Sequence, residues 1–258
     1  MTEAEKAKEN WRNYWNKPGV AESFGGKEEL ETNPKYYLEE KPIVDLIPNC
    51  ETILDAGCGI GRYTALVKDK CKLYVGVDYS VAMLEQARKN NPYPNIVYIQ
   101  GDLAEIDFEK ALSEASVKGM YALKLGQNKF DVGLLIAIIR HLPTEKGLAV
   151  LRNVRNACRT LLFTATIIPE EEAIPLIIKG IEDNKIIDIP YHLSDIKKTL
   201  QVDTIDATKI GDRDPTKGIR YLFKISDVEV EELPPSLSTG KPWNRISNVR
   251  RIVGGRVS

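Results

Sequence analysis

The sequence predicts an α/β fold whose mostly parallel sheet carries its functional residues at the carboxyl ends of the strands. Ile53 and Leu54 form a short apolar run. Alternating glycines follow it, and then a helical pattern begins at Leu66 and Val67. This is the order strand, tight loop, helix. A second run, 73–78, is apolar on both faces and ends in an acid. Such a run is typical of a strand buried inside a parallel sheet.

The glycine loop spans residues 57–61, Gly-Cys-Gly-Ile-Gly. Glycine has no Cβ and tolerates positive φ, so this backbone can approach a ligand closely, and the N–H groups that open the helix face that ligand. A dinucleotide fingerprint would need a third glycine where the chain has Arg62. Asp55, at the end of the preceding strand, would repel a pyrophosphate but suits an ammonium and a sulfonium group. S-adenosylmethionine (SAM) carries both groups.

Residues 55–61, Asp-Ala-Gly-Cys-Gly-Ile-Gly, resemble the first motif of class I SAM-dependent methyltransferases, and further blocks follow in the family's order over roughly residues 36–226. The resemblance implies a three-layer, doubly wound, Rossmann-like α/β fold. Its sheet is expected to be mostly parallel and seven-stranded, with an antiparallel last strand.

The resemblance also implies roles for residues at the next strand ends. Asp78 would bind the ribose, since one carboxylate can accept from two adjacent hydroxyls. Asp102 would accept from the adenine amino group, with the N–H of Leu103 on the ring. Tyr79 and Met83 would flank the adenine, although simple core packing explains them equally well. The predicted cofactor-binding residues are Asp55, Gly57, Cys58, Gly59, Gly61, Asp78, Tyr79, Met83, Asp102, Leu103 and Ile136.

The fourth strand, 130–136, precedes a block that often carries a histidine in this family, and the backbone at Ile136 would face the methionine end of SAM. His141 lies in this block, and His192 lies in a later insertion. Both are expected at the carboxyl edge of the sheet, so either is a candidate general base for O-methylation, with His141 the better one. The alternative is that His141 only bonds backbone and that His192 caps a turn.

The chain of 258 residues fits one decorated domain. We expect an N-terminal helical cap segment over 1–47, a SAM-binding methyltransferase domain over 48–226, and an acidic-then-basic tail over 227–258. The domain would contain insertions at 104–129, an outer decoration, and at 167–193, a substrate lid. Three aromatic residues, Trp11, Tyr14 and Trp15, would share one side of a helix that packs on the main domain or covers the active site.

The end of the domain is expected to contain two antiparallel strands, at 202–205 and 221–225. Ser80 and Ser194 are the expected N-caps of the helices that follow them.

Composition limits the partners. The net charge of −1 excludes a protein-wide attraction to nucleic acid or anionic membranes. The basic tail with Trp243 could bind RNA by charge and stacking, or it could be solvated or partner-bound.

Four cysteines without a C-x-x-C pair, and two histidines, predict no metal site. No apolar run approaches the roughly 20 residues of a membrane span, and the charged N-terminus is unlike a signal peptide, which predicts a cytoplasmic protein. The oligomeric state is left open.

Several functions fit these features. The first is a SAM-dependent methyltransferase acting on an oxygen or nitrogen of a small or medium polar acceptor. The second is RNA (tRNA) or protein methylation, favoured by the tail and by a loose likeness of residues 136–144 to tRNA wobble-uridine methyltransferases. The third is a non-catalytic SAM-fold subunit that binds a partner. A nicotinamide-dependent oxidoreductase would be distinguished by competition from NAD.

Overall fold

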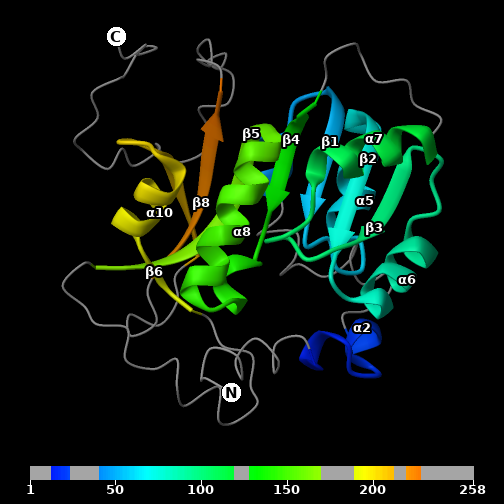
Figure 1. The fold of residues 1–258 in the computed structure, drawn as a ribbon, viewed down its shortest axis with the longest axis horizontal. Helices are drawn as coiled ribbons and strands as arrows, with labels where there is room; N and C mark the ends of the chain where they lie inside the picture. Colours follow the sequence, from blue (N-terminus) through cyan, green and yellow to red (C-terminus); the bar gives the residue numbers. More distant parts are fainter. Residues whose placement is uncertain (1–12, 24–40, 119–127, 170–188, 212–218, 228–258) are drawn as a thin grey trace.

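The protein is built on one mixed sheet of eight strands (Figure 1). The computed structural model describes residues 13–23, 41–118, 128–169, 189–211 and 219–227. The strand order is β3-β2-β1-β4-β5-β8-β7, and β6 pairs with β5 beside this path. The strands are β1 Cys50–Ala56, β2 Cys71–Asp78, β3 Ile96–Gln100, β4 Phe130–Leu135, β5 Cys158–Ile168, β6 Tyr191–His192, β7 Asp206–Gly211 and β8 Ile219–Ser226.

The strands β1 to β5 are parallel to one another, whereas β8 runs antiparallel to both of its neighbours, β5 and β7. Figure 1 shows β8, in orange, pointing opposite to β4. The predicted fold class, a doubly wound and mostly parallel sheet with an antiparallel last strand, is therefore confirmed. The two-residue strand β6 is an addition to the seven expected strands.

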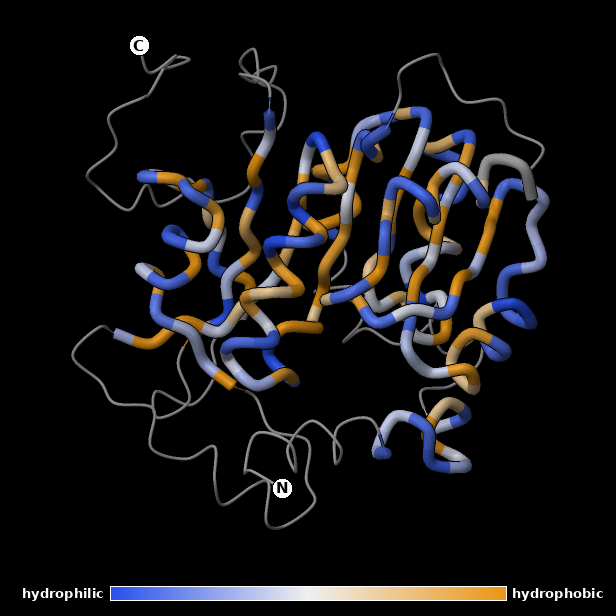
Figure 2. The backbone as a smooth tube through the Cα atoms, viewed as in Figure 1, coloured by the Kyte–Doolittle hydropathy of each residue, from blue (hydrophilic) through white to orange (hydrophobic). Residues whose placement is uncertain are grey.

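Helices cover both faces of this sheet. They are α2 Val20–Ser23, α5 Arg62–Val67, α6 Val81–Asn90, α7 Phe108–Lys118, α8 Thr144–Ala157 and α10 Leu193–Leu200, with the short 3-10 turns η1 Lys68–Lys70 and η2 Ile139–His141. One buried cluster joins the strands to α7, α8 and α10, and a second joins them to α5, α6 and the helical residues 41–45. The result is three layers, with the apolar residues concentrated along the strands (Figure 2).

The strands are continuous apolar runs in the sequence because their side chains alternate between two faces of the sheet and both faces are buried. In β1, Leu54 and Ala56 belong to the cluster beneath α7 and α8, whereas Ile53 belongs to the cluster beneath α5 and α6. Successive side chains of a strand point to opposite faces, and here both faces are buried. After Thr52, the next polar residue of β1 is Asp55, near its carboxyl end.

The helix α7 is part of the core rather than a decoration. Its residues Phe108, Leu112 and Ala115 are buried and pack against the strands. The first part of the predicted insertion 104–129 therefore completes a layer of the fold, and residues 119–127 lie outside the described part of the chain.

Two predictions near the end of the domain are wrong in detail. The strand expected at 202–205 begins only at Asp206. The helix α10 begins at Leu193 with His192 in the N-cap position, so Ser194 is not the N-cap. The cause is β6: Tyr191 and His192 pair with the last two residues of β5, and the chain enters the helix directly from this strand. The predicted lid over 167–193 is thus flanked by sheet at both ends, and its middle, 170–188, lies outside the described residues.

The predicted N-cap of α6 is confirmed, because the Ser80 hydroxyl accepts a hydrogen bond from the Met83 amide at 3.3 Å. Trp11 and the tail beyond Asp227 lie outside the described residues. Among the helices that are described, none has the length and apolar character needed to cross a membrane.

Candidate active site

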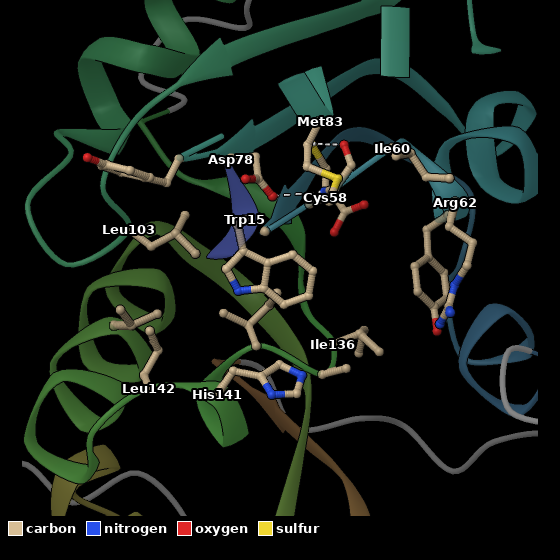
Figure 3. Close-up of a pocket in the computed structure, with 18 of the residues that line it drawn as sticks. Trp15, Cys58, Ile60, Arg62, Asp78, Met83, Leu103, Ile136, His141 and Leu142 are labelled. Atoms are coloured by element: carbon tan, nitrogen blue, oxygen red, sulfur yellow. Dashed lines mark hydrogen bonds between the residues drawn. The ribbon is translucent and has the colours of Figure 1, made fainter. Parts of the chain in front are cut away.

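A cavity of about 210 Å³ opens at the carboxyl ends of the strands, between the glycine loop, α6 and the segment after β4 (Figure 3). Most of the residues predicted to bind a cofactor line it. These are Asp55, Gly57, Cys58, Gly59, Asp78, Tyr79, Met83, Asp102, Leu103 and Ile136, together with the base candidate His141.

The glycine loop takes a left-handed backbone path that needs glycine. The φ angles of Gly57, Gly59 and Gly61 are 84°, 51° and 78°. The amides of Gly57 and Cys58 both donate to the Val77 carbonyl, at 2.7 and 3.1 Å, which fixes the loop to the end of β2.

The glycines of this loop have different roles. A Cβ placed on Gly59 would meet no atom within 4 Å, so the space beside it is open to a ligand. A Cβ on Gly61 would lie 2.5 Å from Asn91 Nδ2 and 2.7 Å from the Tyr98 hydroxyl. Gly61 does not line the cavity, and the packing of α5 against its neighbours explains this glycine without a ligand.

Asp78 is held by the loop that it faces. Its Oδ2 accepts from the Gly59 amide and its Oδ1 from the Ser80 amide, both at 2.9 Å. Burial raises the pKa of this carboxyl, and the backbone N–H groups of Ser80, Gly59 and Tyr79 oppose that rise. The carboxylate plane is therefore fixed at the cavity wall before any ligand arrives.

Asp55 is the most buried acid of the site, with 2% of its surface exposed. Burial raises its pKa to about 7, while a hydrogen bond from the Tyr74 hydroxyl, at 2.5 Å, lowers it, the nearby charge of Asp78 raises it and that of Arg62 lowers it. This carboxyl changes its charge near neutral pH. An ammonium group placed beside it would favour the ionised form.

Asp102 forms an ion pair that sequence reasoning missed. Lys146 Nζ lies 2.6 Å from Asp102 Oδ2, and the two side chains are only 13% and 12% exposed. Asp102 Oδ1 accepts from the Ala104 amide at 3.1 Å. Lys146 comes from the first turn of α8, more than forty residues later in the chain, and no local motif marks it.

The opposite wall is formed by the segment that leaves β4. Ala137 has a φ of 60°, unusual for a residue with a Cβ, and its amide donates to the Thr164 hydroxyl at 2.7 Å. The turn η2 follows and carries His141. A hydrogen bond from β6 stabilises this turn, since the Tyr191 hydroxyl donates to the Ile139 carbonyl at 2.8 Å.

The structure does not bring the two histidines together. His141 lines the cavity, whereas His192 is not among its lining residues. His192 lies in β6, paired with Ile168 of β5.

Trp15 also lines the cavity, although it is not among the predicted cofactor-binding residues. Its indole lies between Asp78 and His141 in Figure 3. Its carbonyl accepts a hydrogen bond from the Ser80 hydroxyl at 2.8 Å. The neighbouring α2 contacts α6, and Ala21 packs with Ile60 and Met83. The N-terminal segment 13–23 is thus docked on the walls of the cavity.

Cys58 is poorly suited to act as a nucleophile. Its thiol is buried, and this burial, with the nearby charges of Asp78 and Asp55, raises its pKa well above the ordinary value. The thiol therefore stays protonated and serves as a small apolar group of the loop.

The strand order, the glycine loop and the carboxylates at three strand ends define a class of protein. Residues 53–117 match the family described as "Methyltransferase domain". This match, over about a quarter of the chain, confirms the resemblance to the class I SAM-dependent methyltransferases that the sequence showed, and solved structures of such enzymes share the fold.

Particular relatives follow. Trans-aconitate 2-methyltransferase from Escherichia coli O1:K1 / APEC is 33% identical over 92 residues, which cover 31% of this chain and 36% of that protein. The match therefore spans little more than a third of the relative's length.

Two solved structures share the fold. The magnesium protoporphyrin IX methyltransferase from Synechocystis PCC 6803, with bound SAM, has 17% identity and a TM-score of 0.52, covering 84% of this chain and 95% of that one. A structure described as a DhpI–SAH complex has 12% identity and a TM-score of 0.57, covering 88% and 98%.

Proposed function

We propose that this protein is a SAM-dependent methyltransferase that transfers the methyl group to an oxygen or nitrogen of a small or medium polar acceptor. The observation that carries the proposal is the gathering of Asp55, Asp78 and Asp102 around one glycine loop in one cavity. These acids come from or directly after β1, β2 and β3, which are adjacent in the sheet. Ligands of open α/β sheets bind at this edge.

The cavity fits the parts of SAM one by one. The fixed carboxylate of Asp78 suits the two ribose hydroxyls, and the open side of Gly59 admits a close approach. Asp55 suits the ammonium group. Asp102 and Leu103 suit the adenine edge. The three carboxylates outnumber the lining cations Arg62 and Lys146, which suits a ligand with one net positive charge.

The chemistry asks the chain mainly for positioning. When bound, SAM supplies an activated methyl group whose sulfur leaves as the acceptor attacks from the opposite side. The residues of the cavity hold the acceptor in line and exclude water. For a hydroxyl acceptor, His141 would take the proton as the new O–C bond forms. A neutral amine acceptor would need no such base for its attack.

The N-terminal segment belongs to the site in this proposal. Of the two alternatives that the sequence left open for Trp15, packing on the domain and covering the active site, the cavity lining and the hydrogen bond from Ser80 support both at once. We therefore include residues 13–23 in a cap that closes the cavity beside the acceptor.

Relatives of this chain favour a small acceptor. The relatives named trans-aconitate 2-methyltransferase act, by that name, on a small molecule, which favours a small acceptor here. The basic tail that would favour RNA lies outside the described residues, and nothing in the described cavity favours RNA over a metabolite. The non-catalytic alternative predicts that SAM is not bound.

Binding tests the proposal first. Calorimetry on the full chain with SAM should show one site, Asp78→Asn should weaken it strongly, and Asp69→Asn, at a side chain that is 87% exposed, should leave it unchanged. NAD should not compete. A screen of labelled methyl transfer to metabolite, tRNA and protein pools then identifies the acceptor class. Absence of SAM binding would overturn the proposal and favour the partner-binding subunit.

A further inference from the structure

The ion pair between Asp102 and Lys146 lies at the cavity, and no motif of the chain explains it. Both side chains line the cavity and both are mostly buried. The neighbouring wall residues Leu103, Leu142 and Val150 are apolar. An unpaired carboxylate is costly in such surroundings, and a nearby ammonium group offsets much of that cost.

The pair also fixes where the carboxylate points. Lys146 Nζ holds Oδ2 at 2.6 Å and the Ala104 amide holds Oδ1 at 3.1 Å. With a partner on each oxygen, the plane of the carboxylate cannot rotate freely. The lone pairs that remain can meet a ligand only as acceptors, because an ionised carboxylate has no proton to donate.

We propose that Lys146 is a positioning residue that makes the cavity select a purine with a 6-amino group over one with a 6-oxo group. The inference rests on the proposed function, in which Asp102 faces the adenine. A 6-amino group donates to the ionised, oriented carboxylate. A 6-oxo group presents only an acceptor there and is repelled. Without Lys146, Asp102 can turn or take up a proton, and a protonated carboxyl donates to a 6-oxo group as readily as it accepts from an amine.

A different placement of the Lys146 ammonium group would change the selectivity in the other direction. If the Lys146 ammonium itself touched the base, it would donate to a 6-oxo group and lower the selectivity of the natural protein. Removing it would then raise the preference for adenine. The two arrangements are therefore distinguished by the direction in which the selectivity changes, and not only by its size.

The test measures a ratio of dissociation constants. Calorimetry on the full chain compares S-adenosyl-L-homocysteine with S-inosyl-L-homocysteine, which differ only in the purine. We expect the natural protein to prefer the adenosyl ligand by at least about 30-fold, since a mismatched buried acceptor pair costs affinity. Lys146→Met should lower this ratio at least about tenfold, and Lys146→Arg should keep it within about threefold. Asp102→Asn, whose amide can donate, should abolish or reverse the preference.

Lys110→Met is the matched control, because Lys110 is 72% exposed and pairs with Glu114 at the helix surface. Melting temperatures verify folding, and Lys146→Gln, which keeps a donor without the charge, replaces Lys146→Met if the latter does not fold. An equal loss of affinity for both ligands, or a higher selectivity in Lys146→Met, overturns the inference. Equal binding of both ligands by the natural protein overturns it as well, although the proposed function then stands. If the natural protein binds neither ligand, it is the proposed function that fails.

Discussion

The indole of Trp15 and the imidazole of His141 lie with their ring centroids 5.9 Å apart and their planes tilted by 58°. Trp15 comes from the N-terminal segment and His141 from the turn after β4, so residues far apart in the chain share one wall of the cavity. The Trp15 carbonyl is at the same time bonded to Ser80, on the cofactor side. One short segment thus spans the predicted cofactor and acceptor sides.

Trp15→Ala should weaken SAM binding by about ten- to thirtyfold, because a large aromatic side chain would no longer cover the cavity. Trp15→Phe should recover most of the loss. Calorimetry with SAM measures both, and an unchanged melting temperature separates lost contact from lost folding. An affinity within twofold of the natural value in Trp15→Ala would contradict a cap role.

His141→Gln should lower kcat about 100-fold for a hydroxyl acceptor, since a positioned base contributes on this scale, while SAM affinity stays unchanged. His192→Gln is the matched control, because His192 does not line the cavity. Steady-state rates on the acceptor found by the labelled-methyl screen, together with calorimetry, provide the measurement. Full turnover in His141→Gln would remove the base role, and loss of turnover in His192→Gln alone would transfer it.

SAM affinity should rise as pH increases from 5 to 7. The pKa of Asp55 is about 7 in the ligand-free protein, and an ammonium ligand prefers the ionised form, so binding below that pH must release a proton. The slope should approach tenfold per pH unit well below the pKa. Asp55→Asn should bind more weakly and without this slope. Calorimetry over this pH range measures the slope, and an equal slope in Asp55→Asn would refute Asp55 as the partner of the ammonium group.

The same carboxyl affects stability in a defined direction. Its pKa in the folded protein lies above the ordinary value of 3.8, so the folded state binds more protons than the unfolded state between about pH 4 and 7. The contribution of Asp55 to the free energy of unfolding therefore falls as pH rises through this window. Ligand-free Asp55→Asn should lose less stability than the natural protein over that range in urea titrations.

Thr164→Val should destabilise the fold by about 1–3 kcal/mol, because the Ala137 amide would lose its hydroxyl partner. Ala137 has a positive φ and depends on such support, so SAM affinity should fall as well. Thr166→Val is the control on the same strand. Its hydroxyl is buried and has no hydrogen-bond partner within the described part of the chain. Urea titrations that give equal losses for the two variants would contradict the assigned role of Thr164.

Local signals made the central part of the fold predictable from the sequence. Each of the first three strands is a mostly apolar run with an acid within two residues of its end, so the positions of Asp55, Asp78 and Asp102 at the strand ends could be predicted. The N-cap of α6 at Ser80 was likewise predictable from the neighbouring residues alone. The fold class and the resemblance to class I methyltransferases are confirmed, whereas the roles of the site residues remain predictions.

Contacts between distant segments were not predictable in the same way. Lys146 reaches Asp102 only because α8 packs on the sheet, and nothing near residue 146 indicates that partner. Ser194 has the residue type of an N-cap, but the pairing of β6 with β5 starts the helix two residues earlier, with His192 as the N-cap. In both cases the tertiary contact, and not the local pattern, decides the outcome.

The hydroxyl of Ser80 has one proton and two lone pairs, and it uses them in both directions: it donates to the Trp15 carbonyl and accepts from the Met83 amide. Engineers who shorten or replace the chain before residue 24 would therefore also disturb the first turn of α6, although they had left that helix untouched. Fusion partners and purification tags should therefore be attached so that residues 13–23 keep their native sequence and their packing against the domain.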